Sequence, residues 1–478
     1  MNGLMVIRVL AALLLILAFF LVFPGGVAWW FRESTWPFFC AVAVTGIPSL
    51  AGLYFTRNMR GELNSRDGFM IVSLGWLVAV VAGAVPFVAS GLLGWVDAIF
   101  EASAGYTTTG SSILTDVEVW PKGMLFWRSL TQWLGGMGML LLALAILPAL
   151  GVGGMQIMKA EVPGPSKDRF TPRLISTARI LWGIYLGYTL LATVGFYGVG
   201  MDWLEALDHA MTALSTGGFS TRNASFGAFS AAAQWVAIVF MTLGGINFMI
   251  HYHVLFRRNF RILNTSELHV YLGLIVVSSL VIALSRLWTH PDLETALREG
   301  FFQVVSIMTT TGFATSDYAQ WPFLAQAILG GLMVIGGMSG STGGGVKVIR
   351  VIVLLKTVAV VCRRLLTPLR IIHLQVDRET VPRDMVEACV AMILLAIVLV
   401  LGSMVILILL GMDPVSAFGA ALTCFSNVGP GFGTVGPASN FAAVPEVGKI
   451  LLAILMVVGR LEIYTVVLIF TIGFWRRR

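Results

Sequence analysis

Four glycine-centred polar motifs, each lying between apolar segments, constrain this chain more than any other feature. In each of them an apolar segment, a short helix-like stretch, a small-residue motif and a second apolar segment follow one another. The central glycines are Gly110, Gly218, Gly312 and Gly429. Non-helical backbone at membrane depth is tolerated only where it is buried in protein or lines a water-filled path. The four interruptions therefore predict one shared pore.

The residues of these motifs suit a site for an unhydrated cation. The candidate K⁺ ligands are Thr108, Thr109 and Gly110; Thr216, Gly217 and Gly218; Thr310, Thr311 and Gly312; and Asn427, Val428 and Gly429. Glycine permits backbone conformations that a Cβ forbids, and rings of carbonyls replace the hydration shell of K⁺ in selectivity filters. One such motif alone is more typical of a turn or a close helix contact. Four motifs in equivalent positions favour an ion filter.

The composition is that of an integral membrane protein. Hydrophobic residues make up 57% of the chain and charged residues 12%, with a mean hydropathy of +0.88. These values leave too few polar residues to cover a soluble surface. The net charge of +7 is concentrated in loops and no soluble domain-sized segment is present, so we expect contacts with lipid and protein partners and none with nucleic acid. The cysteines lack the spacing of a metal site or a disulfide framework.

The apolar segments predict an all-α membrane fold. Residues 4–23 and 37–55 form a two-helix hairpin, because no signal-peptide cleavage site follows the first segment. The outer and inner helices of the repeats are then expected at 69–90 and 122–147, 171–197 and 231–256, 268–288 and 321–362, and 385–410 and 445–475. Ten spans and four re-entrant loops result. We expect the four helix–pore loop–helix repeats to surround one pore with pseudo-fourfold symmetry.

This organisation divides the chain into five parts. The hairpin occupies 1–66, and the four repeats occupy 67–158, 159–262, 263–372 and 373–478. Lys and Arg are concentrated in the loops between repeats, which the positive-inside rule makes cytoplasmic. The opposite side carries many Asp and Glu residues and predicts an acidic outer vestibule. Asp97, Asp202, Asp292 and Asp413 also precede the pore helices, where a carboxylate stabilises the helix N-terminus, attracts cations, or does both.

A glycine-rich segment, residues 336–347, interrupts the third inner helix. Each glycine costs roughly 1 kcal/mol against alanine inside a helix, so the helix must break. A movable loop on the cytoplasmic half of the pore is a candidate gate, and the alternative is a kinked helix packed closely on its neighbour. The candidate gate residues are Gly336, Gly337, Ser339, Gly340, Ser341, Thr342, Gly343, Gly344, Gly345 and Lys347.

Arg460 is the second candidate gate element, because it lies deep in the last apolar segment. A charge at that depth is expensive and faces the bundle interior or water. One reading makes it an electrostatic barrier to cations below the filter. The other pairs it with Glu462 or with carbonyls of the glycine loop. We expect Lys347 to be solvated on the cytoplasmic side.

The motifs together resemble the Trk/Ktr/HKT cation transporter superfamily. The resemblance rests on the stretch 128–138 (RSLTQWLGGMG), the four glycine motifs, the sequence Asn427-Val428-Gly429-Pro430-Gly431 and the glycine loop. The additional N-terminal hairpin makes the chain most similar to the TrkH/TrkG branch of bacterial Trk potassium-uptake subunits.

That resemblance implies a multi-pass protein of the bacterial inner membrane, with one K⁺ pore in each subunit of a homodimer. It also implies a TrkA-type cytosolic ring that binds nucleotides. The family's filter glycines correspond to the four central glycines, and its pore-facing arginine corresponds to Arg460. A serine in the first filter accompanies Na⁺ preference in related plant transporters, and Gly110 at that position favours K⁺.

K⁺ is thus expected as the transported and bound ion, with no organic cofactor and no enzymatic activity. Two other hypotheses remain: a symporter coupled to H⁺ or Na⁺, and a scaffold subunit with a vestigial pore. A symporter needs titratable groups or broken helices near the midplane, whereas the acids of this chain lie mainly outside the predicted spans.

Overall fold

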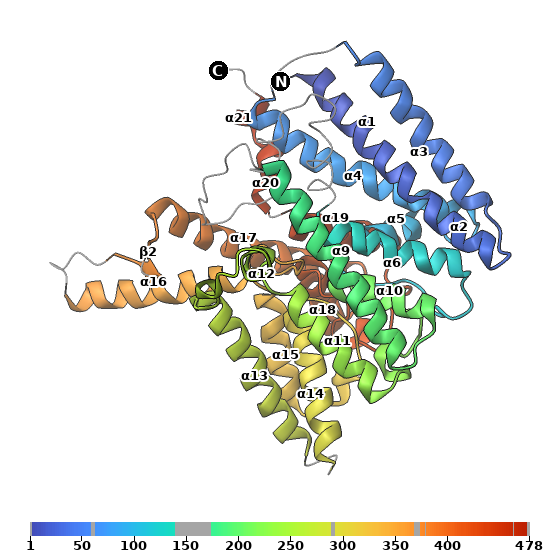
Figure 1. The fold of residues 1–478 in the computed structure, drawn as a ribbon. Helices are drawn as coiled ribbons and strands as arrows, with labels where there is room; N and C mark the ends of the chain where they lie inside the picture. The colour runs from blue at the N-terminus through green and yellow to red at the C-terminus, as the bar shows by residue number, and fades with distance from the viewer. Residues whose placement is uncertain are drawn as a thin grey trace.

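The computed structural model describes residues 2–58, 63–138, 174–287, 292–367, 373–377, 379–461 and 463–475. These residues are mostly α-helical, as expected. One departure from an all-α fold is a short antiparallel pair, β1 (Gln375–Val376) and β2 (Glu379–Thr380), in the connection between the third and fourth repeats. Figure 1 shows this pair beside α16 (Val348–Leu366), on an arm that projects from the helical body.

The N-terminal hairpin forms as predicted. Helices α1 (Gly3–Phe20) and α2 (Val22–Trp30) follow one another almost without interruption, and α3 (Trp36–Phe55) returns beside them (Figure 1). The Ser49 hydroxyl donates a hydrogen bond of 2.6 Å to the Ala11 carbonyl. Both α1 and α3 pack on the first outer helix, so the hairpin is attached to the first repeat.

Each glycine motif follows a short helix that lies after a long outer helix. The outer helices are α4 (Ser65–Ala89), α9 (Leu174–Gly198), α13 (Ser266–Arg286) and α17 (Arg383–Leu409). The short helices, which we call pore helices, are α5 (Trp95–Tyr106), α10 (Trp203–Leu214), α14 (Leu293–Met308) and α18 (Pro414–Ser426). Asp202, Asp292 and Asp413 accept N-terminal amide hydrogen bonds, and Asp97 lies in the first turn of α5. The expected stabilisation of the helix N-termini is thus present.

The expectation of continuous inner helices is wrong for the second and the fourth of them, whereas the break in the third was predicted. The first inner helix, α6 (Lys122–Gly136), ends at Gly136. Its predicted continuation over 139–147 lies outside the described residues. The others are divided: α11 (Ala231–Gly244) and α12 (Phe248–Leu255), α15 (Phe323–Ile335) and α16, and α19 (Glu446–Arg460), α20 (Ile463–Phe470) and α21 (Ile472–Trp475).

The second inner helix shows why hydropathy alone missed these breaks. Helices α11 and α12 meet at an angle of 95°. The Asn247 side chain accepts a hydrogen bond from the Met249 amide at the start of α12, so a new helix begins there although the segment remains apolar. Among the described residues, six helices are long and apolar enough to cross a membrane, and up to eight if each bent pair is one span, against the ten expected.

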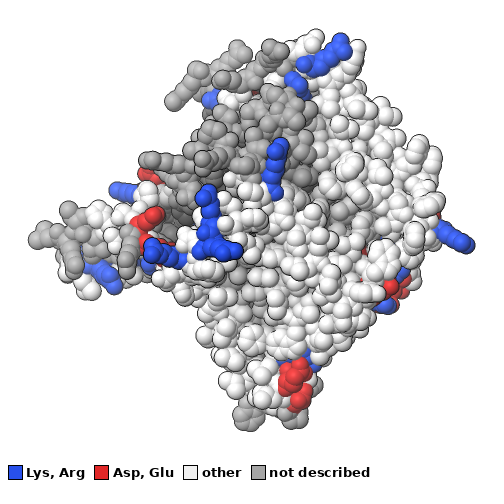
Figure 2. All heavy atoms as spheres, viewed as in Figure 1, with Lys and Arg blue, Asp and Glu red and all other residues white. Residues whose placement is uncertain are grey.

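Short 3₁₀ helices lie in the connections: η2 (Ser225–Ala228), η3 (Phe260–Leu263), η4 (Tyr318–Gln320) and η5 (Gly433–Val435). Three of them, η2, η4 and η5, lie between a glycine motif and the following inner helix. Figure 2 shows that the described residues on the viewed side are largely uncharged, with Lys, Arg, Asp and Glu in small, separate groups, several of them near the edges and beside the projecting arm. Such a surface suits contact with lipid.

Candidate ion pathway

The four glycine motifs adopt the same unusual backbone. Two residues before each central glycine, Thr108, Thr216, Thr310 and Asn427 have φ values of 54°, 53°, 61° and 55°. The central glycines have φ values of 77°, 82°, 84° and 99° in the same order. Asn tolerates the left-handed region, whereas a β-branched residue adopts it rarely and only where its surroundings impose it. The conformation is therefore set by the structure around the motifs.

Each motif leaves its pore helix through the same turn. The amide of the residue before the central glycine donates to a carbonyl five residues back. These bonds are Thr109 to Ala104 (2.9 Å), Gly217 to Thr212 (2.8 Å), Thr311 to Ser306 (2.7 Å) and Val428 to Thr423 (3.0 Å). Because the bonding is repeated, all four segments start from their helix ends in equivalent geometry.

The central glycines pack against one another's backbones. A Cβ added to Gly110 would lie 2.2 Å from the Gly217 oxygen, one on Gly218 1.9 Å from the Thr311 oxygen, one on Gly312 2.0 Å from the Val428 oxygen, and one on Gly429 2.7 Å from the Thr109 oxygen. Each motif thus touches the next in chain order, and the fourth touches the first. No side chain fits at these positions, because separations below 3.0 Å from a Cβ do not occur in relaxed structures.

Side chains reinforce the contact between the fourth and first motifs. The Asn427 amide donates to the Thr109 hydroxyl at 2.8 Å and to the Met456 carbonyl at 3.0 Å. The Ser111 hydroxyl donates to the Gly429 carbonyl at 3.1 Å. The ends of the chain's repeat region are thereby joined through backbone and side-chain contacts.

A cavity of about 190 Å³, which we call the vestibule, adjoins all four central glycines. Its lining comes from residues that follow the motifs, and the charged side chains in it are Arg128 and Arg222. The expected acidic lining is wrong for this cavity. Carboxylates of the outer side are instead paired with basic side chains: Glu101 with Arg128, Glu205 with Arg222, Glu299 with Arg286, and Asp97 with Lys449.

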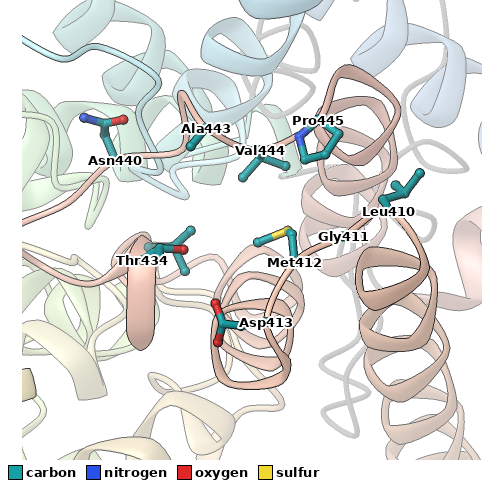
Figure 3. A pocket seen from close by; sticks show the side chains of 10 residues that line it. Leu410, Gly411, Met412, Asp413, Thr434, Asn440, Ala443, Val444 and Pro445 are labelled. Atoms are coloured by element: carbon teal, nitrogen blue, oxygen red, sulfur yellow. The ribbon is translucent and has the colours of Figure 1, made fainter.

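A second cavity of about 210 Å³ lies next to the vestibule, with Val435 and Asn440 in both linings. Figure 3 shows Asp413 on its wall, at the start of α18 and beside Met412. The Asp413 carboxylate accepts hydrogen bonds from the Val415 and Ser416 amides at 3.1 and 3.0 Å. Hydrogen bonding from Ser416 lowers the pKa of Asp413, so this carboxylate is charged and serves as a helix cap.

The glycine loop lies on the other side of the motifs. The predicted break is confirmed, because α15 ends at Ile335 and α16 begins at Val348. The Gly344 amide donates to the Thr310 hydroxyl at 2.6 Å. The Thr342 hydroxyl donates to the carbonyls of Leu214 (3.0 Å) and Gly244 (2.9 Å). The loop therefore contacts residues that precede the central glycines, whereas residues that follow them line the vestibule.

Two glycines at the neck of this loop allow its strands to meet. Gly336 and Gly345 have φ values of 76° and 75°, and a Cβ on Gly336 would lie 2.3 Å from the Gly344 oxygen. The Lys347 amide donates to the Ile335 carbonyl at 2.8 Å, which closes the neck. Other contacts hold the tip: Ser339 N to Glu267 Oε1 (2.7 Å), Ser341 Oγ to Met338 O (2.7 Å), Phe248 N to Gly340 O (3.0 Å) and Val348 N to Gly337 O (3.1 Å).

Arg460 connects the loop to the first inner helix. Its Nη1 donates to the Thr342 carbonyl at 2.6 Å, and its Nη2 donates to the carbonyls of Gly135 and Gly136 at 2.8 and 2.9 Å. Of the alternatives left open by the sequence, pairing with a loop carbonyl is therefore observed, and Glu462 lies outside the described residues. The expectation of a solvated Lys347 is wrong: this residue is half-buried and its Nζ donates to the Gly343 carbonyl.

Sequence reasoning assigned no role to two buried polar residues of α6. Arg128 forms a buried ion pair with Glu101 at 2.8 Å, and Gln132 contacts the second glycine motif. A signal was present, because residues 128 and 132 lie one helical turn apart in a segment that is otherwise suited to burial. What the sequence did not contain was the identity of their partners.

The comparisons agree with this geometry. Residues 37–475 match the TrkH family model, described as a cation transport protein. The chain belongs to the TrkH family. It is 36% identical to the Trk system potassium uptake protein TrkH of Halomonas elongata, covering 99% of each chain. It is 37% identical to TrkH of Escherichia coli K12, covering 98% of each.

A solved structure supports the same assignment. The crystal structure of the potassium transporter TrkH from Vibrio parahaemolyticus matches with a TM-score of 0.90 and 34% identity, over 100% of both chains. The resemblance to the TrkH/TrkG branch is thus confirmed. Membership of this family and the long apolar helices make the chain a multi-pass protein of the bacterial inner membrane.

Proposed function

We propose that this chain takes up K⁺ through one pore that the four glycine motifs form in pseudo-fourfold arrangement. The observation that carries the proposal is the closed series of glycine–carbonyl contacts, in which each motif abuts the next and the fourth abuts the first. Four equivalent segments with left-handed residues and no Cβ can direct backbone carbonyls at one dehydrated cation. The relatives are named as potassium uptake proteins, which supports K⁺ as the ion.

Carbonyl oxygens are the main ligands in this proposal. The hydroxyls of Thr216 and Thr310 form hydrogen bonds with the Thr342 hydroxyl and the Gly344 amide of the glycine loop, so these two hydroxyls face away from the vestibule. The carbonyls of Thr109, Gly217, Thr311 and Val428 lie beside the central glycines. Their spacing and field strength would set the preference for K⁺ over Na⁺.

The glycine loop and Arg460 form the gate. The loop is bonded to Leu214 at the end of α10 and to Thr310 of the third motif, and Arg460 connects it to α6. Movement of the loop would change access to the motifs from the cytoplasmic side. The positive charge of Arg460 also opposes cation passage while it is held there.

Two features of the assembly belong to the same proposal. We propose that this chain forms a homodimer. Because the relatives are named as parts of a Trk system, we also propose that a TrkA-type cytosolic subunit that binds nucleotides regulates it. The boundaries at 66, 158, 262 and 372 are proposed as the limits of the hairpin and the four repeats.

A specific observation keeps the coupled symporter as a second candidate. Asp208 lies within the pore helix α10, between the predicted spans, and its side chain is buried. A buried carboxylate close to an ion path is a candidate for coupled proton binding. A symporter would therefore show K⁺ flux that responds to a pH gradient, and replacing Asp208 with Asn would abolish that response.

Flux into liposomes tests both candidates. Purified protein is reconstituted and uptake of K⁺, Rb⁺ and Na⁺ is measured, with Gly110→Ser and Gly429→Ser as filter variants. Selective K⁺ and Rb⁺ uptake that the variants impair, without dependence on a pH or Na⁺ gradient, supports the channel-like pore. Uptake that requires such a gradient supports the symporter, and equal uptake of Na⁺ and K⁺ contradicts the proposed filter.

A further inference from the structure

We propose that Gln132 of α6 is a positioning residue for ion selectivity, because its side chain forms hydrogen bonds with the second glycine motif on both sides of Gly218. This inference rests on the proposed function, in which the motif is one wall of the filter. Gln132 belongs to the 128–138 stretch, and neither the proposed filter nor the proposed gate gives it a role.

Gln132 makes two hydrogen bonds to the motif with the two ends of its amide. Its Nε2 donates to the Gly217 carbonyl at 2.6 Å, and its Oε1 accepts from the Phe219 amide at 3.0 Å. The side chain is fully buried, and a Cβ added to Gly217 would lie 2.4 Å from Gln132 Cδ. The amide group is therefore packed directly against the motif and fixes the peptide groups before and after Gly218.

The Gly217 carbonyl is one of the four oxygens that adjoin a neighbouring central glycine, in this case Gly110. A carbonyl oxygen has two lone pairs, and the Gln132 amide occupies one of them. The second lone pair remains for an ion. The donor at 2.6 Å thus controls both the direction of this carbonyl and its strength as a ligand, which are the properties on which K⁺ selectivity depends.

The corresponding positions of two other inner helices carry no such group. Gly135, Gly244 and Gly459 occupy equivalent places, because a Cβ on each would meet the carbonyl at the end of a pore helix, those of Tyr106, Leu214 and Phe425. Three residues before these glycines stand Gln132, Met241 and Met456. Methionine therefore occupies this position in two other inner helices, which makes Gln132→Met a well-matched substitution.

A neighbouring side chain supports the rest of the same segment. Arg128, one turn earlier on α6, lies with its guanidinium carbon 4.0 Å from the ring centroid of Phe219 and donates to the Ser220 carbonyl at 3.4 Å. Its charge is balanced by Glu101, to which Nε donates at 2.8 Å. Arg128 supports the part of the segment that leads into the vestibule, and Gln132 supports the part that adjoins the proposed ion site.

The test compares Gln132→Met with a matched control, Gln234→Met. Gln234 of α11 is also a buried glutamine that binds loop backbone, through the Phe226 and Phe229 carbonyls at 2.9 and 3.3 Å, but it does not touch the motif. We expect the K⁺/Na⁺ flux ratio in liposomes to fall about fivefold to tenfold in Gln132→Met, because the bond to the proposed ligand, the Gly217 carbonyl, is lost and one hydrogen bond of ordinary net strength corresponds to about this factor. In Gln234→Met the ratio should stay at the wild-type value, whatever happens to total flux.

The outcomes separate this inference from the proposed function. Wild-type protein without K⁺ selectivity contradicts the proposed function itself. Selective wild-type protein together with a wild-type ratio in folded Gln132→Met overturns the role of Gln132, as does an equal fall in both variants, which would indicate general loosening. If Gln132→Met does not yield a monodisperse protein, Gln132→Leu, which keeps the branched end of the side chain, decides by the same ratio.

Discussion

Replacing Arg460 with Ala tests whether this residue holds the glycine loop in place. Arg460 donates to the Thr342 carbonyl of the loop and to the Gly135 and Gly136 carbonyls of α6. In Arg460→Ala the link between loop and helix is lost, whereas the Thr342 hydroxyl keeps its bonds to Leu214 and Gly244. The loop should therefore remain folded but leave its closed position more often.

The size of the effect follows from one charge-assisted bond. Such a bond contributes about 1.5–3 kcal/mol, so its loss should raise the ratio of open to closed states about tenfold to 150-fold. Single-channel recordings in planar bilayers give the open probability, and the ratio of open to closed states is calculated from it. Arg383→Ala is the control, because Arg383 is an exposed arginine paired only with the exposed Glu387 in the contacts observed, and such pairs contribute about 0–1 kcal/mol.

Arg460→Lys distinguishes holding the loop from acting as an electrostatic barrier. Lysine keeps the positive charge but lacks the planar fork that reaches several carbonyls at once. A loop-holding role predicts an open probability close to that of Arg460→Ala. A barrier role predicts wild-type behaviour for Arg460→Lys. An unchanged open probability in well-folded Arg460→Ala would refute the loop-holding role, and an unchanged single-channel conductance would refute the barrier role.

The remaining predictions concern the motifs and their supports. Gly218→Ala should abolish K⁺ flux, because its Cβ would lie 1.9 Å from the Thr311 oxygen at a φ of 82°. The control Gly402→Ala has open space around the added Cβ and should conduct normally. K⁺ flux into liposomes is measured for both variants. Glu101→Gln should destabilise the fold by about 3–5 kcal/mol, since it leaves a buried arginine unpaired, and the thermal melting temperature should fall. Thr342→Val removes the three hydrogen bonds that this hydroxyl forms with Leu214, Gly244 and Thr216, and should raise the open probability; a lower value in recordings would contradict a restraining role.

Much of the fold and some of the site were predictable from the sequence, because they depend on local composition. The outer helices, the hairpin and the pore helices appear close to their expected positions, since apolar length and N-terminal Asp residues determine them locally. The break after Ile335 also follows from glycine density alone. The division of the second inner helix was missed, because α12 begins at a side-chain cap within an apolar segment, where hydropathy does not change.

Tertiary structure decided which charged side chains form ion pairs and which residues contact one another. The Asp and Glu residues of the outer side were expected to form an acidic vestibule, but Glu101 is paired with Arg128 and Glu205 with Arg222. Lys347 turns back to the loop instead of into solvent. Ion pairs and buried hydrogen bonds depend on distances of a few ångströms between remote residues, and no local pattern contains those distances.

The sequence by itself determined that four glycine-centred segments at membrane depth need a common polar environment, because each contains backbone that lipid cannot satisfy. Only the tertiary structure decided how they meet: Gly110 packs against Gly217 and Gly429 against Thr109. Gln132 forms a hydrogen bond with the second segment, and Arg460 joins the glycine loop to α6. The physical reason is that residue type states which conformations and bonds are allowed, whereas packing of the helices selects the partners that satisfy them.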